Sequence, residues 1–166
     1  MTNINKYFIA NLKMYGNKKY IKSIKKVIDF KKKKKYAKAK LIYCPPYTLL
    51  SDFVNFTKKS SIDVGAQNCH QNEFSGSYTG SISPNMVKSL GAKYIIIGHS
   101  ENRISGDSNL IINKKIISAL NQKLNVIFCV GETLKEKNKN ITKTVLKNQI
   151  INGLKKINKI NKIIFA

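Results

Sequence analysis

The segment from Gly98 to Arg103 gathers side chains of the types that transfer protons and stabilise charge. It places His99, Ser100 and Glu101 directly after a short apolar run, Tyr94–Ile97. That run predicts a buried strand with polar groups at its tip, where parallel α/β proteins place their chemistry. An isolated histidine is more often a buried residue bonded to a backbone carbonyl, but this one shares its segment with Glu101 and the only arginine of the chain.

A second pair of polar residues follows the first predicted strand, Tyr7–Ala10. Asn11 and Lys13 are two positions apart, so in an extended chain their side chains project to the same side. Taken alone, the pair is an ordinary loop entrance.

Both segments resemble signatures of the triosephosphate isomerase family. Gly98–Arg103 is similar to the family's Gly-His-Ser-Glu-Arg-Arg, with Asn102 in place of the first arginine, and residues 11–14 are similar to its Asn-Trp-Lys-Met. Gly-Ala-Gln-Asn at 65–68, Thr-Gly at 79–80 and Cys-Val-Gly-Glu at 129–132 resemble further family segments in the same order. The resemblance therefore covers essentially the whole chain.

The resemblance implies an aldose–ketose isomerase of glycolysis and gluconeogenesis. The family interconverts dihydroxyacetone phosphate and D-glyceraldehyde 3-phosphate through an enediolate, without cofactor or metal, and is itself the known example of a neutral histidine acting as electrophile. It implies that His99 polarises the carbonyl and that Lys13 offsets developing negative charge. Asn11 would bind a substrate oxygen and Glu101 would hold neighbouring groups, with Ser100, Cys129 and Glu132 as supporting residues.

Strands and helices are expected to alternate along residues 1–166, a single α/β domain. The predicted strands are 7–10, 41–43, 62–67, 94–97, 125–130 and 162–166. Predicted helices cover 18–30 and 48–56, a third from the Ser83-Pro84 start to Gly91, a fourth capped by Asp107 that covers Leu110, Ile112, Ile116 and Leu120, and a fifth at 141–154. The lysine run at 31–35 is expected to be a solvated helix end. This is the pattern of a TIM-type (β/α)8 barrel with its first six strands.

A long polar segment, 68–81, separates the third strand from the next helix, and such loops are usually functional or disordered. Its Gly76-Ser-Tyr-Thr-Gly-Ser81 stretch resembles the family's Gly-Ala-x-Thr-Gly-Glu loop, with Thr79 and Gly80 kept at the tip and Ser81 replacing the glutamate. The family's loop reaches into a partner subunit, so the resemblance implies a homodimer for a completed barrel.

In the family, a glutamate that acts as the base follows the sixth strand in an Ala-Tyr-Glu-Pro-Val-Trp type segment. Ala166 stands where that segment would begin. The 166 residues are therefore expected to be inactive by themselves. They are interpreted as an incomplete barrel: a fragment, an interrupted reading frame or one half of a split enzyme, and in the last case a carboxyl-terminal fragment that supplies the last units would restore activity. The apolar stretch Ile163–Phe165 is a predicted aggregation site, and a poorly soluble or partly molten polypeptide is expected.

The formal charge of +23 comes almost wholly from lysine. A coding bias towards lysine, asparagine and isoleucine explains that spread better than a nucleic-acid surface does, although a decayed, non-catalytic protein that binds polyanions is the alternative. Another phosphate-handling barrel of different chemistry is a third possibility. Three scattered cysteines indicate neither disulfides nor zinc, and no segment suggests a membrane span or a leader, so a cytoplasmic location is expected.

Overall fold

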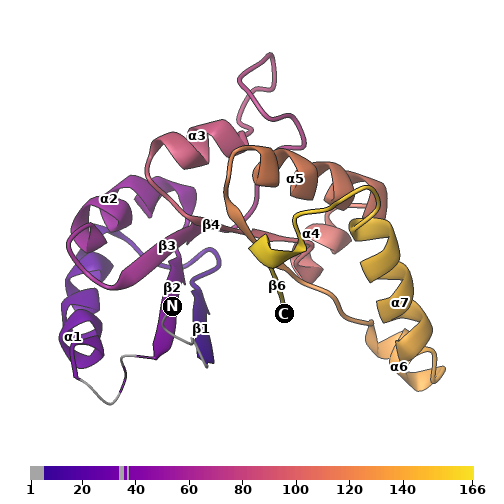
Figure 1. Ribbon diagram of the computed structural model, residues 1–166, viewed down its shortest axis with the longest axis horizontal. Helices are drawn as coiled ribbons and strands as arrows, with labels where there is room; N and C mark the ends of the chain where they lie inside the picture. The colour runs from indigo at the N-terminus through magenta and orange to yellow at the C-terminus, as the bar shows by residue number, and fades with distance from the viewer. Residues whose placement is uncertain (1–5, 34–35, 37) are drawn as a thin grey trace. The chain divides into compact units, whose positions relative to one another are not determined.

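The computed structural model describes residues 6–33, 36 and 38–166. The chain forms two compact units, one comprising the described part of Met1–Gln67 with Val87–Ile95, the other Asn68–Met86 with Ile96–Ala166. Figure 1 labels their elements. Hydrogen-bonded neighbours follow the chain order from β1 to β6 in a six-stranded sheet. The assignment of residues 1–166 to a single domain stays a prediction.

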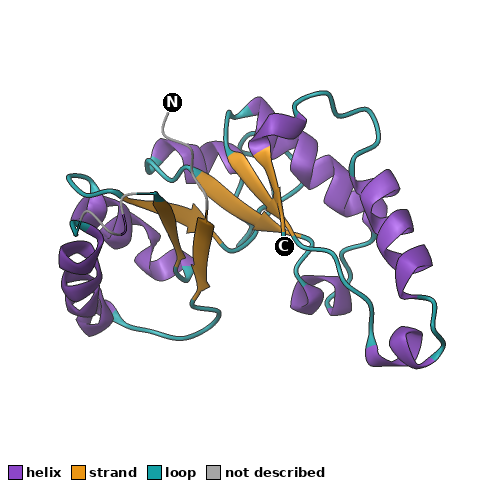
Figure 2. Cartoon of the chain, turned by 60° about the horizontal axis from the view of Figure 1, so that its bottom comes forward, coloured by secondary structure: helices purple, strands orange, loops and turns teal. Residues whose placement is uncertain are grey.

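Three parallel strands and the start of a fourth form the sheet of the first unit. Its elements are β1 (Lys6–Asn11), η1 (Lys18–Tyr20), α1 (Ile21–Lys31), β2 (Ala39–Cys44), α2 (Tyr47–Thr57), β3 (Ile62–Ala66) and the first half of β4 (Tyr94–Ile97). Helices α1 and α2 lie on the same side of these strands (Figures 1 and 2). Strand β3 is buried along its whole length, as expected where both faces of a parallel sheet are covered.

The second unit packs helices against β5 and β6. Its elements are the end of β4, α4 (Ser100–Ile104), α5 (Asn109–Asn121), β5 (Asn125–Phe128), α6 (Leu134–Asn138), α7 (Thr142–Gly153), η3 (Ile160–Lys162) and β6 (Ile163–Phe165), while α3 (Pro84–Ser89) crosses the boundary between the units. The side-chain amide of Asn113 on α5 donates to the carbonyls of Gly153 and Lys155, each at 2.9 Å, and so ties α5 to the end of α7.

The predicted strands and most predicted helices are present within a few residues of their expected bounds. Ser83 caps α3 through a 3.2 Å hydrogen bond from the Met86 amide, and Gly91 follows that helix with φ of +95°. The short helices α4 and α6 were missed, although Thr133 and Glu136 form the capping box that starts α6. None of the helices described for this chain is long and apolar enough to cross a membrane.

Three expectations are wrong in detail. Ser108, not Asp107, caps α5, because the Ser108 hydroxyl accepts the Ile111 amide at 3.3 Å while Asp107 pairs with a lysine. Leu110 is 65% exposed and takes no part in the core. Lys31, expected in solvent, is buried and donates to the Tyr36 carbonyl at 2.7 Å. Lys34 and Lys35 of the same run lie outside the described residues.

A buried carboxylate connects three strands of the first unit. Asp63 on β3 has a side chain only 7% exposed and pairs with Lys40 of β2 and with Lys93 at the start of β4, the latter at 2.9 Å. Burial opposes ionisation of Asp63, but hydrogen bonds and charges from the two lysines outweigh it and hold its pKa below the ordinary value.

We expect the Asp63 carboxylate to contribute stability that is lost in acid. A lowered folded-state pKa means that the contribution is present above the unfolded value of about 3.9 and disappears as pH falls through that value towards the folded one. Asp63→Asn should cost about 1–3 kcal/mol at neutral pH and flatten the acid limb of the stability curve, measured by urea unfolding from pH 7 to pH 3. The control is Asp29→Asn, whose pair with Lys32 is exposed and should contribute under about 1 kcal/mol. Equal losses in both variants would contradict the prediction.

Candidate active site

Asn11 and Lys13 lie in the first unit, at the end of β1. The Asn11 Oδ1 atom accepts the Lys13 amide at 2.9 Å, and Lys13 itself has φ of +50°, a left-handed conformation that is uncommon for a lysine. The side-chain amide of Gln67 donates to the carbonyls of Lys13 at 2.8 Å and Cys44 at 2.9 Å. The backbone N–H and the carbonyl of Lys13 are therefore both held by side chains, which fixes the backbone of this loop.

His99 lies in the second unit, between β4 and α4. It is the N-cap residue of α4, and its Nδ1 accepts the backbone amide of Glu101 at 3.3 Å. Nδ1 also lies 3.5 Å from Glu101 Oε2, but an ion pair there requires a protonated ring, whereas the amide can only donate. With Nδ1 as the acceptor of this amide, Nε2 is the ring nitrogen left to carry a proton. That N–H is the group able to donate a hydrogen bond to a ligand oxygen.

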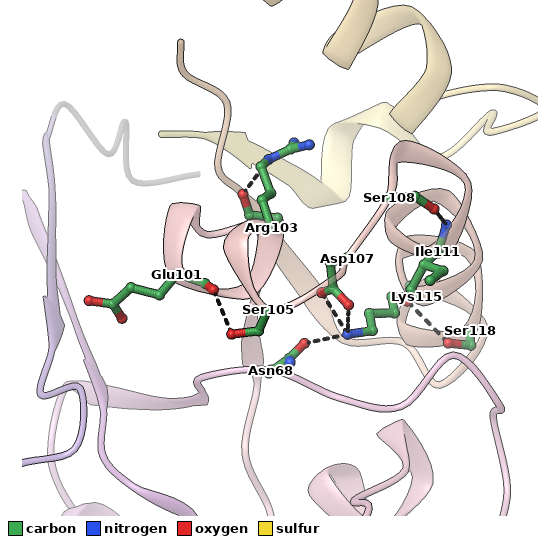
Figure 3. A network of polar contacts seen from close by, with 10 residues as sticks. Asn68, Glu101, Arg103, Ser105, Asp107, Ser108, Ile111, Lys115 and Ser118 are labelled. Atoms are coloured by element: carbon green, nitrogen blue, oxygen red, sulfur yellow. Dashed lines mark hydrogen bonds and ion pairs between the residues drawn. The ribbon is translucent and has the colours of Figure 1, made fainter. Parts of the chain in front are cut away.

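Ser100 and Glu101 form the first turn of α4. The His99 side chain is only 22% exposed, whereas the Glu101 side chain is 57% exposed and points away from the other labelled side chains in Figure 3. The Glu101 carbonyl accepts the Ser105 hydroxyl at 3.0 Å, which closes this short helix. Ser100 is exposed. Glu101 thus contacts the Nδ1 side of the imidazole and leaves Nε2 available.

Arg103 connects the ends of two strands to a helix. Its Nε donates to the Gly98 carbonyl at 2.8 Å, Nη2 donates to the Cys129 carbonyl at 3.2 Å, and Nη1 donates to Asn109 Oδ1 at 2.8 Å. Burial lowers the pKa of the guanidinium from its ordinary value, with Cys129 and Asp107 acting against that shift. Sequence reasoning noticed this residue as the only arginine but gave it no place in the site.

Gly98 occupies a position that only glycine fits. It has φ of +80°, and a Cβ would lie 2.9 Å from the Cys129 carbonyl oxygen and 3.1 Å from Arg103 Nη2. We expect Gly98→Ala to lower the free energy of unfolding by at least about 2 kcal/mol, because backbone strain and a steric clash add. Gly80→Ala is the matched control, since Gly80 has φ of +79° with nothing within 4 Å of its Cβ position. Urea unfolding measures both, and similar losses would show that the clash contributes nothing.

Cys129 and Glu132 follow β5 in the second unit. Burial raises the pKa of the half-buried Cys129 thiol, which makes it a poor nucleophile. Glu132 Oε1 accepts the Thr142 hydroxyl at 3.3 Å. Gln149 of α7 accepts the Gly131 amide at 2.9 Å and donates to the Gly131 carbonyl at 2.8 Å, so it fixes the turn that precedes Glu132. Gln149 was missed, because a glutamine in a helix carries no sequence signal for such a role, whereas Gln67 was noticed only as part of the Gly-Ala-Gln-Asn segment.

Thr79 and Gly80 are exposed in the long connection between β3 and α3. The connection leaves the strands as a loop without helix or strand (Figure 1). Within it the rings of His70 and Tyr78 lie 4.4 Å apart, and the Asn72 amide hydrogen-bonds the Tyr78 hydroxyl. In the first half of the loop, Glu73 accepts hydrogen bonds from Asn121, the last residue of α5, and from Gln122, which follows it. The loop is thus built from its own side chains and anchored on α5.

A buried ion pair anchors the start of this loop, next to β3 (Figure 3). Lys115 of α5 is 6% exposed, and its ammonium donates to both carboxylate oxygens of Asp107, at 2.8 and 2.7 Å, and to Asn68 Oδ1 at 3.1 Å. All three N–H donors of the ammonium are therefore satisfied. Asn68 is the last residue of the Gly-Ala-Gln-Asn segment, so the network fixes the point where the loop begins.

Comparison with known proteins identifies the family of this chain. The family model described as triosephosphate isomerase matches residues 6–166. The chain belongs to the triosephosphate isomerase family. It is 41% identical over 158 residues to a triosephosphate isomerase of Clostridium botulinum, covering 91% of this chain and 63% of that protein. It is 42% identical over 165 residues to one of Dictyoglomus thermophilum, covering 97% and 65%. A crystal structure of triosephosphate isomerase from Bartonella henselae superposes with a TM-score of 0.87 at 33% identity, covering 96% of this chain and 65% of that one.

Membership of the triosephosphate isomerase family confirms the predicted fold class, a (β/α) barrel family with six parallel strands in this chain. The chain spans about 63–65% of the length of these relatives. The candidate residues divide between the two units: Asn11 and Lys13 belong to the first, and the residues from His99 to Glu132 belong to the second. Among the described residues, no group of three or more His, Cys, Asp or Glu side chains could hold a metal ion.

Proposed function

We propose that this protein supplies the histidine and lysine side of a triosephosphate isomerase site. The reaction would interconvert dihydroxyacetone phosphate and D-glyceraldehyde 3-phosphate through an enediolate, as a cytosolic step of sugar breakdown and synthesis. The observation that carries the proposal is the hydrogen bond from the Glu101 amide to His99 Nδ1, which leaves Nε2 as the ring nitrogen that can donate. A neutral N–H beside a carbonyl oxygen can polarise it and then return a proton to it, which an enediolate requires.

The other candidate residues suit the charge that develops on the substrate. A Lys13 ammonium near the substrate oxygen would stabilise the enediolate more than the uncharged carbonyl. Asn11 uses its Oδ1 to hold the Lys13 amide, which leaves its NH2 group as the donor for a substrate oxygen. Glu101, on the Nδ1 side of His99, would hold neighbouring groups, and Glu132 would be supported by Thr142.

The base that removes the proton from the substrate carbon has to be a residue other than the four glutamates of this sequence. Glu73 accepts from the side chains of Asn121 and Gln122. Glu132 accepts from Thr142, and Glu136 accepts from the amide and hydroxyl of Thr133. Glu101 lies beside Nδ1 of His99, on the opposite side of the ring from Nε2. We propose that the 166 residues by themselves do not turn over triose phosphate.

Complementation tests this proposal. The 166-residue chain is assayed alone and after mixing with a carboxyl-terminal segment of the Clostridium botulinum relative that begins after the region matched here. Isomerase turnover is followed in both directions by coupled assays. We expect no turnover above background from the chain alone and a clear rise on mixing, since a general base is typically worth about 100- to 10,000-fold.

Two outcomes would contradict the proposal. Turnover by the chain alone would show that one of its own carboxylates is the base. A folded mixture without turnover would refute the isomerase assignment. The alternative, polyanion binding, would appear as affinity that falls steeply with salt, by about one log unit per log unit of salt for each phosphate contacted.

We also propose that the completed enzyme is a homodimer. The loop from Asn68 to Met86 presents Thr79, Gly80 and exposed aromatic side chains, Phe74 at 60% and Tyr78 at 46% exposed. In the first unit, Met14 is 95% exposed and Tyr15 77% exposed, so both units carry apolar surface that a partner subunit could cover. Sedimentation of the complemented enzyme should give twice the mass of one assembled barrel, and a monomer at micromolar concentration would contradict this.

A further inference from the structure

The only arginine of this chain contacts three separate segments of the second unit. Every other basic side chain is lysine, since one of the 31 lysines and arginines is Arg103. Its planar guanidinium reaches the end of β4 at Gly98, the end of β5 at Cys129 and the first residue of α5, Asn109. A lysine ammonium is a compact charge on a flexible stem and does not present donors in a fixed planar fork. The geometry therefore requires arginine at this position.

The contact with Gly98 bears directly on His99. The Gly98 carbonyl and the His99 nitrogen belong to one planar peptide unit, so holding that oxygen fixes the plane from which the His99 side chain departs. Gly98 itself has φ of +80° and no side chain to resist rotation. On the other side of His99, the Glu101 amide holds Nδ1. The imidazole is thus oriented by two hydrogen bonds, one before it and one after it in the chain.

We propose that Arg103 is a positioning residue that orients the His99 imidazole through the Gly98 carbonyl, and that lysine cannot replace it. Arg103 does not touch the reacting atoms; it acts through the peptide between Gly98 and His99 and aligns that peptide with the end of β5. The proposal rests on the proposed function for its consequence in catalysis, but the orientation of His99 can be observed without turnover. The competing explanation is that Arg103 only stabilises the fold and does not affect the orientation of His99.

The NMR signals of the histidine ring nitrogens report directly on the orientation and tautomer of His99. The isotope-labelled 166-residue chain is mixed with the unlabelled carboxyl-terminal segment, and a proton–nitrogen correlation spectrum at pH 8 contains the signals of His99 and His70. His70 serves as internal reference because its Nδ1 accepts the Asn72 amide at 3.1 Å. We expect the parent to show His99 as the Nε2–H tautomer. In Arg103→Lys the His99 signals should move towards a mixture of tautomers while those of His70 stay in place.

Asn109→Ala is the matched control, because it removes one guanidinium contact and leaves both carbonyl contacts. It should lower stability without moving the His99 signals. Unchanged His99 signals in Arg103→Lys, with a loss of stability like that of Asn109→Ala, would overturn the proposal and leave Arg103 as a brace. If Arg103→Lys does not fold, Arg103→Ala is titrated with methylguanidinium or methylammonium. Recovery of the His99 tautomer with methylguanidinium alone supports the proposal, and recovery with neither, or with both, contradicts it.

The second measurement is the isomerase activity of the complemented enzyme. Arg103→Lys should lower kcat about 100-fold, the cost of a displacement of about 1 Å in a catalytic group, and change KM little. If the mixture shows no isomerase activity but the His99 tautomer still responds to Arg103→Lys, the proposed function fails and the positioning role stands. If turnover is normal in Arg103→Lys, the positioning role fails and the proposed function stands.

Discussion

Replacing Lys115 by methionine is expected to lower the free energy of unfolding by about 3–5 kcal/mol, because it leaves a buried carboxylate without its cation. The Asp107 side chain is 13% exposed, and both of its carboxylate oxygens accept hydrogen bonds from the Lys115 ammonium. Asn68 would lose its hydrogen bond from the Lys115 ammonium as well. Since whole domains have stabilities of about 5–15 kcal/mol, this loss is a large share of the total. Urea unfolding at neutral pH measures it.

Two further variants separate the causes of that loss. Lys114→Met on the same helix removes an exposed lysine and should change stability by under about 0.5 kcal/mol. The double variant Lys115→Met with Asp107→Leu removes both charges and should recover most of the loss, since a buried ion pair replaced by apolar groups is often neutral or stabilising. A Lys115→Met protein within about 1 kcal/mol of the parent would mean that water or another residue compensates Asp107. Loss of the ion pair should also make the start of the loop at Asn68 less rigid. Faster hydrogen exchange of the backbone amides from Cys69 onwards would reveal this.

His99→Gln is expected to lower kcat of the complemented enzyme by about 100- to 10,000-fold with little change in KM. Glutamine can place a hydrogen-bond donor near the carbonyl but cannot pass a proton between substrate oxygens. The ring interaction with the Glu101 amide is lost as well, so both the proton donor and its orientation disappear. Steady-state kinetics in the coupled assay give kcat and KM separately.

The control for His99→Gln is Ser105→Ala, at the other end of α4. It removes a 3.0 Å hydrogen bond to the Glu101 carbonyl and should leave kcat within about threefold, since a surface substitution of this kind changes stability by little. A His99→Gln enzyme with kcat within tenfold of the parent would exclude His99 as the group that moves protons. A change in KM alone would assign it to binding.

Most of the architecture could be predicted from the sequence. Alternating apolar runs and amphipathic segments placed all six strands, because buried parallel strands read as short continuous apolar stretches. Motif resemblance placed Asn11, Lys13 and His99 at strand ends, which follows from chain order alone in a β/α fold. Local rules also succeeded where the interaction is local: Ser83 caps α3 as expected. Where two residues competed for one role, as Asp107 and Ser108 did for the cap of α5, the sequence could not decide.

Only the tertiary structure decided the contacts between residues far apart in the chain. Asp107 is drawn away from the cap by Lys115, Gln67 reaches back to Lys13, and Gln149 holds Gly131. The two residues of each pair are separated in the chain. A polar side chain with several acceptors within reach shows no sequence periodicity that would reveal which acceptor it binds. The role of Arg103 is of the same kind: its rarity is visible in the sequence, but the three acceptors that require a planar fork meet only when β4, β5 and α5 are folded together.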